Sequence, residues 1–242
     1  MTRHSPLEET RATAAGRIDL FVFSLDLVDD ELKALEAHLS SEERERGRRL
    51  VDDIDRRRHT AGRGRLREIL SSYAGVAPAD VSFRYGERGK PYLANGRPTF
   101  FNLTHSAHLA AVAVSPDLEL GVDIERLRGV RPDLPKRYFS DEEAAALSAL
   151  HGDAWQATFF RCWTRKEAFI KAIGLGMRQP LKSFSVSLLE DEPARLEWLE
   201  DDDRAPCNWT LIDFAPADGF AGAVAVNTAG APAPSLRIIS RA

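Results

Sequence analysis

Two acidic side chains alternate with apolar ones in the segment ELGVDIE, residues 119–125. Successive side chains of a β-strand point to opposite faces, so Asp123 and Glu125 would share one face with the bare Gly121 beside them. Two carboxylates on one face repel each other. A hard cation such as Mg²⁺ relieves the repulsion, because it binds through one or two carboxylates together with phosphate oxygens. The spacing therefore predicts a magnesium site, with a solvated strand face as the alternative.

A third carboxylate interrupts an apolar helical pattern further along the chain. Residues 159–171 read FFRCWTRKEAFIK, and at about 100° per residue Glu167 falls into the stripe that contains Phe160 and Trp163. A charge in an apolar stripe costs stability unless it is paired or coordinated. Lys171 lies one turn on, so a helix ion pair worth about 0.2–0.5 kcal/mol is one explanation. The other is that Glu167 is a third metal ligand or a general base, with Lys171 directed at phosphate.

A lysine and a histidine stand in segments of distinctive local shape. Lys90 lies between Gly89 and Pro91, which places it on a shaped turn rather than on a free surface. His105 belongs to the segment FNLTHS, residues 101–106, between two apolar strand pieces. A lone histidine is more often structural than functional. Grouped with a turn lysine, Thr104 and a serine, it could equally bind phosphate, so both interpretations stay open.

Arginine is concentrated between Arg44 and Arg67, where it is interleaved with Glu and Asp. A solvated helix face explains most of this run, with one or two arginines directed at phosphate. The formal net charge over all 242 residues is −4. A protein dedicated to nucleic acid usually carries a basic excess, so we expect no nucleic-acid partner.

Other sequence features bear on the compartment. Cys162 and Cys207 are too few for a disulfide framework, and no Cys/His spacing indicates zinc, which fits a reducing cytosol. The segment Met1 to Gly16 is polar and is not a secretory signal, and no stretch approaches the ~18 apolar residues of a membrane span. We therefore expect a cytoplasmic protein without a membrane partner.

The elements that must position these residues follow the same order twice. Ser40 and Ser140 each stand three residues before a glutamate, which is the capping-box pattern that begins a helix. A longer helix is predicted after each box, over residues 54–73 and 155–173, the second ending at Gly174. Strands are predicted in matching places of the two halves: 18–25 and 118–124, 81–85 and 184–188, 110–114 and 221–226.

This repeat predicts an α+β protein made of two similar halves packed as a pseudo-dimer. The junction is expected at Ser115-Pro116-Asp117, which gives a first half of residues 1–116 and a second of residues 117–242. A ligand would lie in the cleft between the halves, a common place for a site. Residues 227–235 are rich in Ala, Pro and Gly and indicate a loose tail.

Four ordered segments together resemble the signature of the 4′-phosphopantetheinyl transferases, specifically the larger Sfp-type that serves peptide and polyketide synthetases. The family pattern is a G-(V/I)-D strand followed by W-x-x-K-E-(A/S)-x-x-K. Here these are Gly121 to Asp123 and Trp163 to Lys171, preceded by G-K-P at 89–91 and F-N-L-T-H-S at 101–106. The resemblance runs from about residue 40 to residue 226, and its fold is a pseudo-dimer of two α+β halves.

The resemblance implies roles for the acidic residues and the helix lysine. Asp123, Glu125 and Glu167 would surround Mg²⁺, and Lys171 would neutralise the pyrophosphate of coenzyme A. The reaction would move the phosphopantetheine group of coenzyme A to a serine of an acyl or peptidyl carrier protein and release adenosine 3′,5′-bisphosphate. Glu167 is the expected base for the serine proton, directly or through a water.

The resemblance also implies the contacts with coenzyme A. Lys90 and His105 would touch it, Thr104 would line the nucleotide site, and Arg46 and Arg58 fall where the family places basic contacts near the 3′-phosphate.

One departure stands out, because Glu43 occupies a position where a close relative carries a lysine. Since it precedes Arg46 by three residues, Glu43 would either compete with the phosphate for that guanidinium or hold it in place.

The implied enzyme is a monomer whose partners are coenzyme A and carrier-protein domains. A different class of function also fits part of the pattern. A non-catalytic regulator that binds coenzyme A or a nucleotide would keep Lys90, Arg46 and Arg58, but it would not need three carboxylates.

Overall fold

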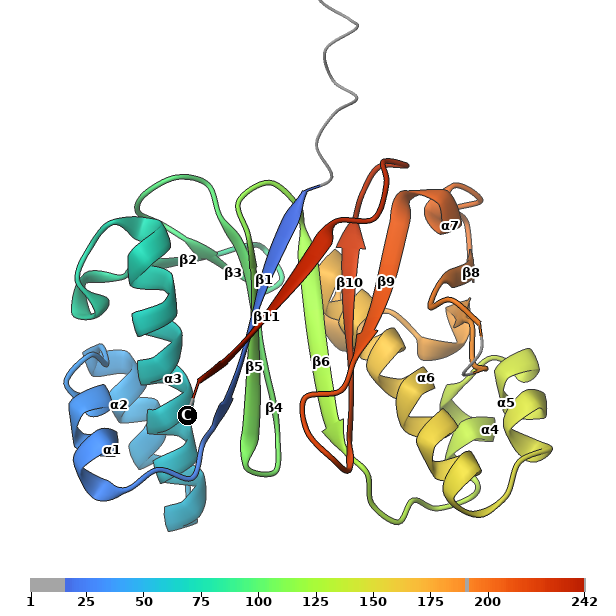
Figure 1. Ribbon diagram of the computed structural model, residues 1–242, viewed down its shortest axis with the longest axis horizontal. Helices are drawn as coiled ribbons and strands as arrows, with labels where there is room; N and C mark the ends of the chain where they lie inside the picture. The colour runs from blue at the N-terminus through green and yellow to red at the C-terminus, as the bar shows by residue number, and fades with distance from the viewer. Residues whose placement is uncertain (1–15, 190–191, 242) are drawn as a thin grey trace, which may run out of the picture.

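The computed structural model describes residues 16–189 and 192–241. Figure 1 shows two halves side by side, with sheets in the middle of the molecule and helices on both outer flanks. The predicted α+β pseudo-dimer is confirmed. The predicted polar N-terminal segment lies outside the described residues apart from Gly16.

The first half is built on a four-stranded sheet in the order β11-β1-β5-β4, in which β11 (Ser235–Arg241) comes from the end of the chain. Its helices α1, α2 and α3 lie on the outer face of that sheet (Figure 1). In chain order its elements are β1 (Arg17–Ser24), α1 (Asp29–Glu36), α2 (Ser41–Arg48), α3 (Asp53–Ala74), the 3₁₀ helix η1 (Pro78–Asp80), β2 (Phe83–Tyr85), β3 (Pro91–Leu93), β4 (Phe100–Ser106) and β5 (Leu109–Ser115). β2 and β3 form a separate hairpin.

The second half forms a three-stranded sheet, in the order β6-β10-β9, and a small β7-β8 pair. Its elements are β6 (Leu120–Arg126), α4 (Leu134–Tyr138), α5 (Asp141–Ser148), α6 (Gly152–Ile173), the 3₁₀ helices η2 (Gly176–Arg178) and η3 (Leu181–Ser183), β7 (Phe184–Val186), β8 (Leu196–Leu199), α7 (Ala205–Asn208), β9 (Trp209–Phe214), β10 (Phe220–Asn227) and β11 (Ser235–Arg241). Within the described residues, no helix is both long and apolar enough to cross a bilayer.

The halves are joined by an apolar core that both sheets share. Leu20 and Val22 of β1 and Ala111 of β5 pack in one cluster with Val122 of β6 and Val224 of β10. All five are buried. Each sheet therefore covers the face that the other would expose to water, and separating the halves would expose this surface.

Local signals explain where the main helices begin and end. Both predicted capping boxes are present, with Ser40 and Ser140 each accepting a hydrogen bond from the backbone N–H of the glutamate three residues on. α3 and α6 both end at a glycine in the left-handed conformation, Gly75 and Gly174. Gly64, which weakens the helical pattern in the sequence, is where the backbone of α1 approaches α3: a Cβ there would lie 2.8 Å from the carbonyl oxygen of Leu35.

The chain does not end as a loose tail. Residues 228–234 form a loop, but β11 follows and pairs in parallel with β1, with Ser235 opposite Arg17. In Figure 1 this strand crosses from the second half to the sheet of the first. The sequence of the Ala- and Pro-rich loop does not predict this strand pairing, because the partner strand lies more than 200 residues earlier in the chain.

α6 lies against β6 because Gly121 has no side chain. A Cβ at residue 121 would meet the carbonyl oxygen of Ala168 at 2.2 Å and the amide nitrogen of Ala172 at 2.3 Å. Both are backbone atoms of α6, so no rotamer change could relieve the clash. The close approach brings the acidic face of β6 and the Glu167 face of α6 together.

Gly121→Ala should therefore lower the free energy of unfolding by about 2 kcal/mol or more, because overpacking a rigid backbone contact forces the helix away from the strand. Gly129→Ala is the matched control, since a Cβ there meets nothing within 4 Å. Urea denaturation measures both variants, and equal stabilities would contradict the close-packing role of Gly121.

Candidate active site

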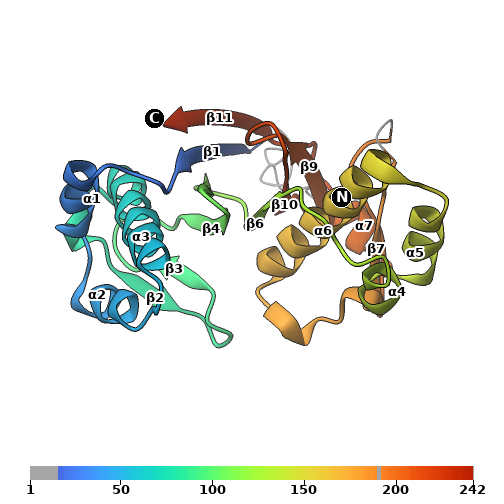
Figure 2. The same ribbon diagram turned by 90° about the horizontal axis from the view of Figure 1, so that it is seen from below.

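A pocket of about 390 Å³ opens between the halves, where β4 of the first half faces β6 and α6 of the second. β4 and β6 lie side by side in both views (Figures 1 and 2). The pocket is lined by Leu103, Thr104, His105, Asp123, Glu125, Trp163, Glu167 and Lys171. Six of the nine residues predicted to form the site thus line one pocket, and the other three do not.

Asp123 is the most deeply buried carboxylate of the pocket. Its Oδ1 accepts hydrogen bonds from the ammonium of Lys171 at 2.6 Å and the hydroxyl of Thr104 at 3.0 Å. Its Oδ2 is buried and has no hydrogen-bond partner among residues 16–189 and 192–241. Burial raises the pKa of Asp123 above the usual range despite the neighbouring lysine. A buried anionic oxygen without a donor costs stability unless something positive meets it.

Glu125 lies two residues further along β6 and lines the same pocket. Its Oε2 accepts hydrogen bonds from the hydroxyl of Ser106 at 2.7 Å and from the guanidinium of Arg128 at 2.8 Å. Arg128 is half exposed, so its ion pair contributes little to stability. Asp123 and Glu125 share the face of β6 opposite the apolar core, as the alternation of the sequence predicts.

Glu167 and Lys171 do not form the helix ion pair that was one of the two explanations. Lys171 reaches across to Asp123 and Thr104, and no ion pair joins it to Glu167 among the described residues. Burial raises the pKa of Glu167, and the charges of Asp123 and Glu125 raise it further. Three carboxylates thus share one pocket with a single lysine, which leaves an excess of negative charge.

The pocket fits a hard cation chemically. Its possible metal ligands are carboxylate oxygens, which Mg²⁺ prefers. One of them, the buried Oδ2 of Asp123, accepts no hydrogen bond from the described residues. Among the described residues, no three His, Cys, Asp or Glu side chains are grouped closely enough to hold an ion alone. Mg²⁺ usually takes one or two protein carboxylates and completes its shell with water and phosphate.

Thr104 and His105 occupy adjacent places on β4 with different surroundings. Thr104 is buried, and its hydroxyl already bonds Asp123 and Lys171. His105 is exposed at the pocket edge, where partial desolvation and the charge of Lys171 lower its pKa. A neutral imidazole at neutral pH can both donate and accept a hydrogen bond.

Lys90 lies outside the pocket lining. Its ammonium bonds the carbonyl oxygen of Ala172 at the end of α6 and the carboxylate of Glu119 at 3.1 Å. Burial lowers the pKa of Lys90. The turn that carries it is shaped as expected, with Gly89 in the left-handed conformation. This lysine therefore joins the two halves.

The two arginines predicted near the 3′-phosphate also lie outside the pocket lining. Arg58 on α3 makes a bidentate ion pair with Asp26, at 2.7 and 2.9 Å. Its charge makes a small contribution to lowering the pKa of His105. Arg46 on α2 is exposed.

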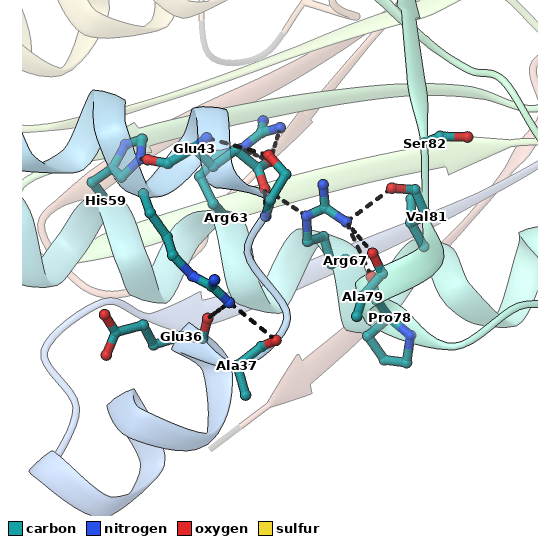
Figure 3. A network of polar contacts seen from close by, with 12 residues as sticks. Glu36, Ala37, Glu43, His59, Arg63, Arg67, Pro78, Ala79, Val81 and Ser82 are labelled. Atoms are coloured by element: carbon teal, nitrogen blue, oxygen red, sulfur yellow. Dashed lines mark hydrogen bonds and ion pairs between the residues drawn. The ribbon is translucent and has the colours of Figure 1, made fainter.

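Glu43 does not interact with Arg46 as either alternative required. Figure 3 shows its carboxylate between Arg63 and Arg67. Arg63 Nε donates to one oxygen at 2.8 Å and Arg67 Nε to the other at 2.6 Å. Glu43 is buried, and its carboxylate also accepts the backbone N–H of Ser40 in the capping box. Both proposed effects on Arg46 are wrong, because the carboxylate turns inward to α3.

This network also changes how the arginine run is interpreted. Arg67 is buried, and it donates as well to the backbone carbonyl of Val81 at 2.8 Å (Figure 3). The expectation of a solvated helix face is therefore wrong for Arg67. A lysine at residue 43 would place a third cation against Arg63 and Arg67, so Glu43→Lys tests folding rather than phosphate binding.

The second half repeats this network at the centre of the W-x-x-K-E motif. Lys166 is fully buried, pairs with the capping-box residue Glu143 at 2.8 Å, and donates to the carbonyl of Phe184. α3 and α6 both have 22 residues, and Arg67 and Lys166 occupy the same place in them. The motif lysine is therefore structural, while Trp163, Glu167 and Lys171 line the pocket. Each buried cation pairs with the glutamate of a capping box, Arg67 with Glu43 and Lys166 with Glu143. The repeated capping boxes are the feature of the sequence that could have indicated them.

Comparison with known proteins identifies the family. The family model for the N-terminal part of 4′-phosphopantetheinyl transferases matches residues 27–117, and that for the 4′-phosphopantetheinyl transferase superfamily matches residues 119–225. The chain is 40% identical to the 4′-phosphopantetheinyl transferase HetI of Nostoc sp. over 217 residues, which cover 88% of each chain.

Two Bacillus proteins are similar over much of their length. A 4′-phosphopantetheinyl transferase of Bacillus subtilis is 36% identical over 71% of this chain and 75% of its own. The 4′-phosphopantetheinyl transferase Sfp of Bacillus subtilis strain 168 is 32% identical over 78% of this chain and 84% of its own. These family models and relatives show that the chain belongs to the 4′-phosphopantetheinyl transferase superfamily.

Proposed function

We propose that the pocket between β4, β6 and α6 is where this chain performs the reaction of its superfamily, the transfer of phosphopantetheine from coenzyme A to a carrier-protein serine. The observation that supports this best is the buried, unpartnered Oδ2 of Asp123 among three carboxylates and beside Lys171. A regulator that only bound coenzyme A would have no use for this acidic group, so catalysis is the better explanation.

Asp123, Glu125 and Glu167 would surround Mg²⁺, with one or two of them as its direct ligands. When bound, the ion supplies positive charge against the pyrophosphate oxygens of coenzyme A. The ion would also contact the Oδ2 of Asp123. Burial of that oxygen destabilises the protein without a cation and would stabilise the complex with one.

Lys171 is placed to exchange partners when the substrate enters. In the free protein it neutralises Asp123 at 2.6 Å. Among the described residues it is the lysine or arginine of the pocket lining, and its long side chain is about 29% exposed, so it can turn toward a phosphate in the pocket. Such charge compensation at the transferred group is the main work of a phosphoryl-transfer site.

Glu167 is the proposed general base. Burial and the neighbouring carboxylates raise its pKa, which makes it a stronger acceptor of the serine proton than an ordinary glutamate. Positive charge from Lys171 and a bound cation would keep it ionised in the loaded site. Glu167 would take the proton directly or through one water while the serine oxygen attacks the phosphorus that carries pantetheine. The bond from that phosphorus to the bridging pyrophosphate oxygen would break, and adenosine 3′,5′-bisphosphate would leave with that oxygen.

His105 and Arg58, with Arg46, would contact the 3′-phosphate of coenzyme A at the first-half side of the pocket. The double variant Arg46→Ala/Arg58→Ala should weaken binding of coenzyme A but scarcely affect dephospho-coenzyme A. Charge-assisted hydrogen bonds contribute about 1.5–3 kcal/mol each, so the ratio of the two affinities should fall about ten-fold or more. Calorimetry measures both ligands.

The matched control for that prediction is Arg48→Ala/Arg49→Ala, which removes two exposed arginines at the end of α2, the helix that carries Arg46. It should leave the affinity ratio unchanged. An unchanged ratio in the Arg46/Arg58 variant would place the 3′-phosphate elsewhere.

The function itself is tested with an apo carrier protein, coenzyme A and Mg²⁺. Mass spectrometry should show a gain of one phosphopantetheine group on the carrier, lost with a chelator and restored by added Mg²⁺. No mass gain would overturn the proposed activity. A gain that survives complete metal removal would overturn the metal role alone.

We also propose that the enzyme acts as a cytoplasmic monomer. The shared core of the two sheets already supplies within one chain the kind of interface that a dimer would form between chains. Sedimentation at assay concentrations would reveal a dimer if the proposal is wrong.

A further inference from the structure

β4 and β6 are facing edge strands of the two sheets, yet within the described ranges no backbone ladder joins them. Side chains of the F-N-L-T-H-S motif take its place. Asn102 Oδ1 accepts the backbone N–H of Val122 at 2.9 Å, and Ser106 Oγ accepts that of Arg126 at 3.1 Å. The polar residues of β4 thus satisfy backbone donors at the open edge of β6 and fix the register of the two strands.

The same register places a hydroxyl against each carboxylate of β6. Thr104 donates to Asp123 and Ser106 donates to Glu125, each pair separated by 19 residues in the chain. Both strands have a side-chain period of two, so a single alignment satisfies both contacts at once. Thr104 is already part of the pocket lining, whereas Ser106 is not.

The hydrogen bonds of Ser106 fix the direction in which its O–H group points. A serine hydroxyl has a single O–H to donate. Because the oxygen accepts the N–H of Arg126, the O–H is committed to Glu125 Oε2 at 2.7 Å. Ser106 is only 9% exposed, so water cannot easily replace it. The other contact of Oε2 is the half-exposed Arg128, and among the described residues Oε1 takes part in no hydrogen bond.

We propose that Ser106 is a positioning residue for the transfer reaction. It holds one oxygen of Glu125 so that the carboxylate lines the pocket beside Asp123 with its other oxygen available to a cation. The inference rests on the proposed metal role of Glu125 and adds a residue that does not touch the pocket. Hydrogen bonds that orient a metal-binding carboxylate typically change metal affinity or activity 10–100-fold when removed.

The test compares Ser106→Thr with Ser106→Val, which have nearly the same shape and differ in the hydroxyl. Binding of Mn²⁺ to each protein in the presence of coenzyme A is measured by calorimetry, without carrier protein, so no turnover is involved. Ser106→Val should bind Mn²⁺ about ten-fold or more weakly, and Ser106→Thr should stay near the wild type. In the carrier assay, Ser106→Val should need correspondingly more Mg²⁺ for half-maximal rate.

Ser115→Ala controls for a purely structural effect. Ser115 is a buried serine on β5 whose oxygen also accepts backbone N–H groups, from Asp117 and Leu118, but in the described part of the chain its hydroxyl makes no hydrogen bond to a carboxylate. It should lower the melting temperature without changing Mn²⁺ affinity. If Ser106→Val does not fold, Ser106→Ala carries the same comparison, and in a Glu125→Gln background it should cost no further affinity.

The outcomes separate the two proposals. Wild-type protein that binds Mn²⁺, together with a hydroxyl-free variant that binds it equally well, would overturn the role of Ser106 alone. Wild-type protein with coenzyme A that binds no Mn²⁺ would overturn the metal role and the role of Ser106 together.

Discussion

Asp123→Ala should abolish transfer while leaving the protein folded. The variant removes the buried oxygen that has no partner and the carboxylate that holds Lys171. In the proposed role of Asp123 as a metal ligand, its loss would remove several kcal/mol of stabilisation at the reacting phosphate, so kcat/KM should fall by about 10³-fold or more. The rate is measured as the appearance of holo-carrier protein at saturating coenzyme A.

The fold should survive because the other face of β6 is untouched. Val122 and Ile124 remain in the core shared by the two sheets. Burial raises the pKa of Asp123, so its ionised form is itself a cost to the free protein, and its removal should lower the melting temperature little. Asp80→Ala, at an exposed position of η1, is the matched control for loss of an aspartate. Near-normal turnover by a folded Asp123→Ala protein would remove Asp123 from the active site.

Glu167→Gln should lower kcat by about 10²-fold or more, because the amide keeps the size of the side chain but cannot accept the serine proton. Stopped or quenched-flow measurement with saturating carrier protein isolates kcat from binding. The melting temperature supplies an independent readout. Since burial and two neighbouring carboxylates raise the pKa of Glu167, its charge destabilises the free protein above that pKa, and removing it should leave the melting temperature at pH 7 equal or higher.

Glu68→Gln is the matched control for that variant. Glu68 occupies on α3 the place that Glu167 occupies on α6, but its partners are Arg65 and His38. It should leave kcat unchanged. If Glu167→Gln retained full kcat and lost about 0.5 kcal/mol of stability instead, Glu167 would be a helix-surface residue and another group would be the base.

The parts of the fold that sequence could predict are those with local causes. The two capping boxes and the glycines that end α3 and α6 depend on residues within a few positions of each other. The acidic face of β6 follows from strand alternation alone. The pairing of β11 with β1 depends instead on residues at opposite ends of the chain, and nothing local to the Pro-rich loop predicts it.

The sequence predicts a site residue well where helix or strand periodicity alone decides the direction of its side chain. It predicts poorly which of several cations will pair with a carboxylate. The pattern placed Glu167 in an apolar stripe, and the structure brings it to the pocket with Asp123 and Glu125. Glu43 was expected to act on Arg46, its neighbour within one helical turn. Two arginines of another helix hold it instead, since a buried carboxylate pairs with the cations that the tertiary fold brings to it.

Lys90 shows the same limit. The Gly-Lys-Pro turn indicates a held lysine, and the ammonium is held, but by Glu119 and by the end of α6 rather than in the pocket. Ser106 shows the reverse case. Its role follows from its register against β6, which only the packing of the two halves defines.

The most direct measurement is a crystal structure of this chain with coenzyme A and Mn²⁺, in which anomalous scattering locates the ion. We expect one Mn²⁺ against the carboxylates of Asp123 and Glu125, with the pyrophosphate of coenzyme A between the ion and Lys171. An ion bound away from Asp123, or a pyrophosphate outside the pocket between β4, β6 and α6, would contradict the proposed active site.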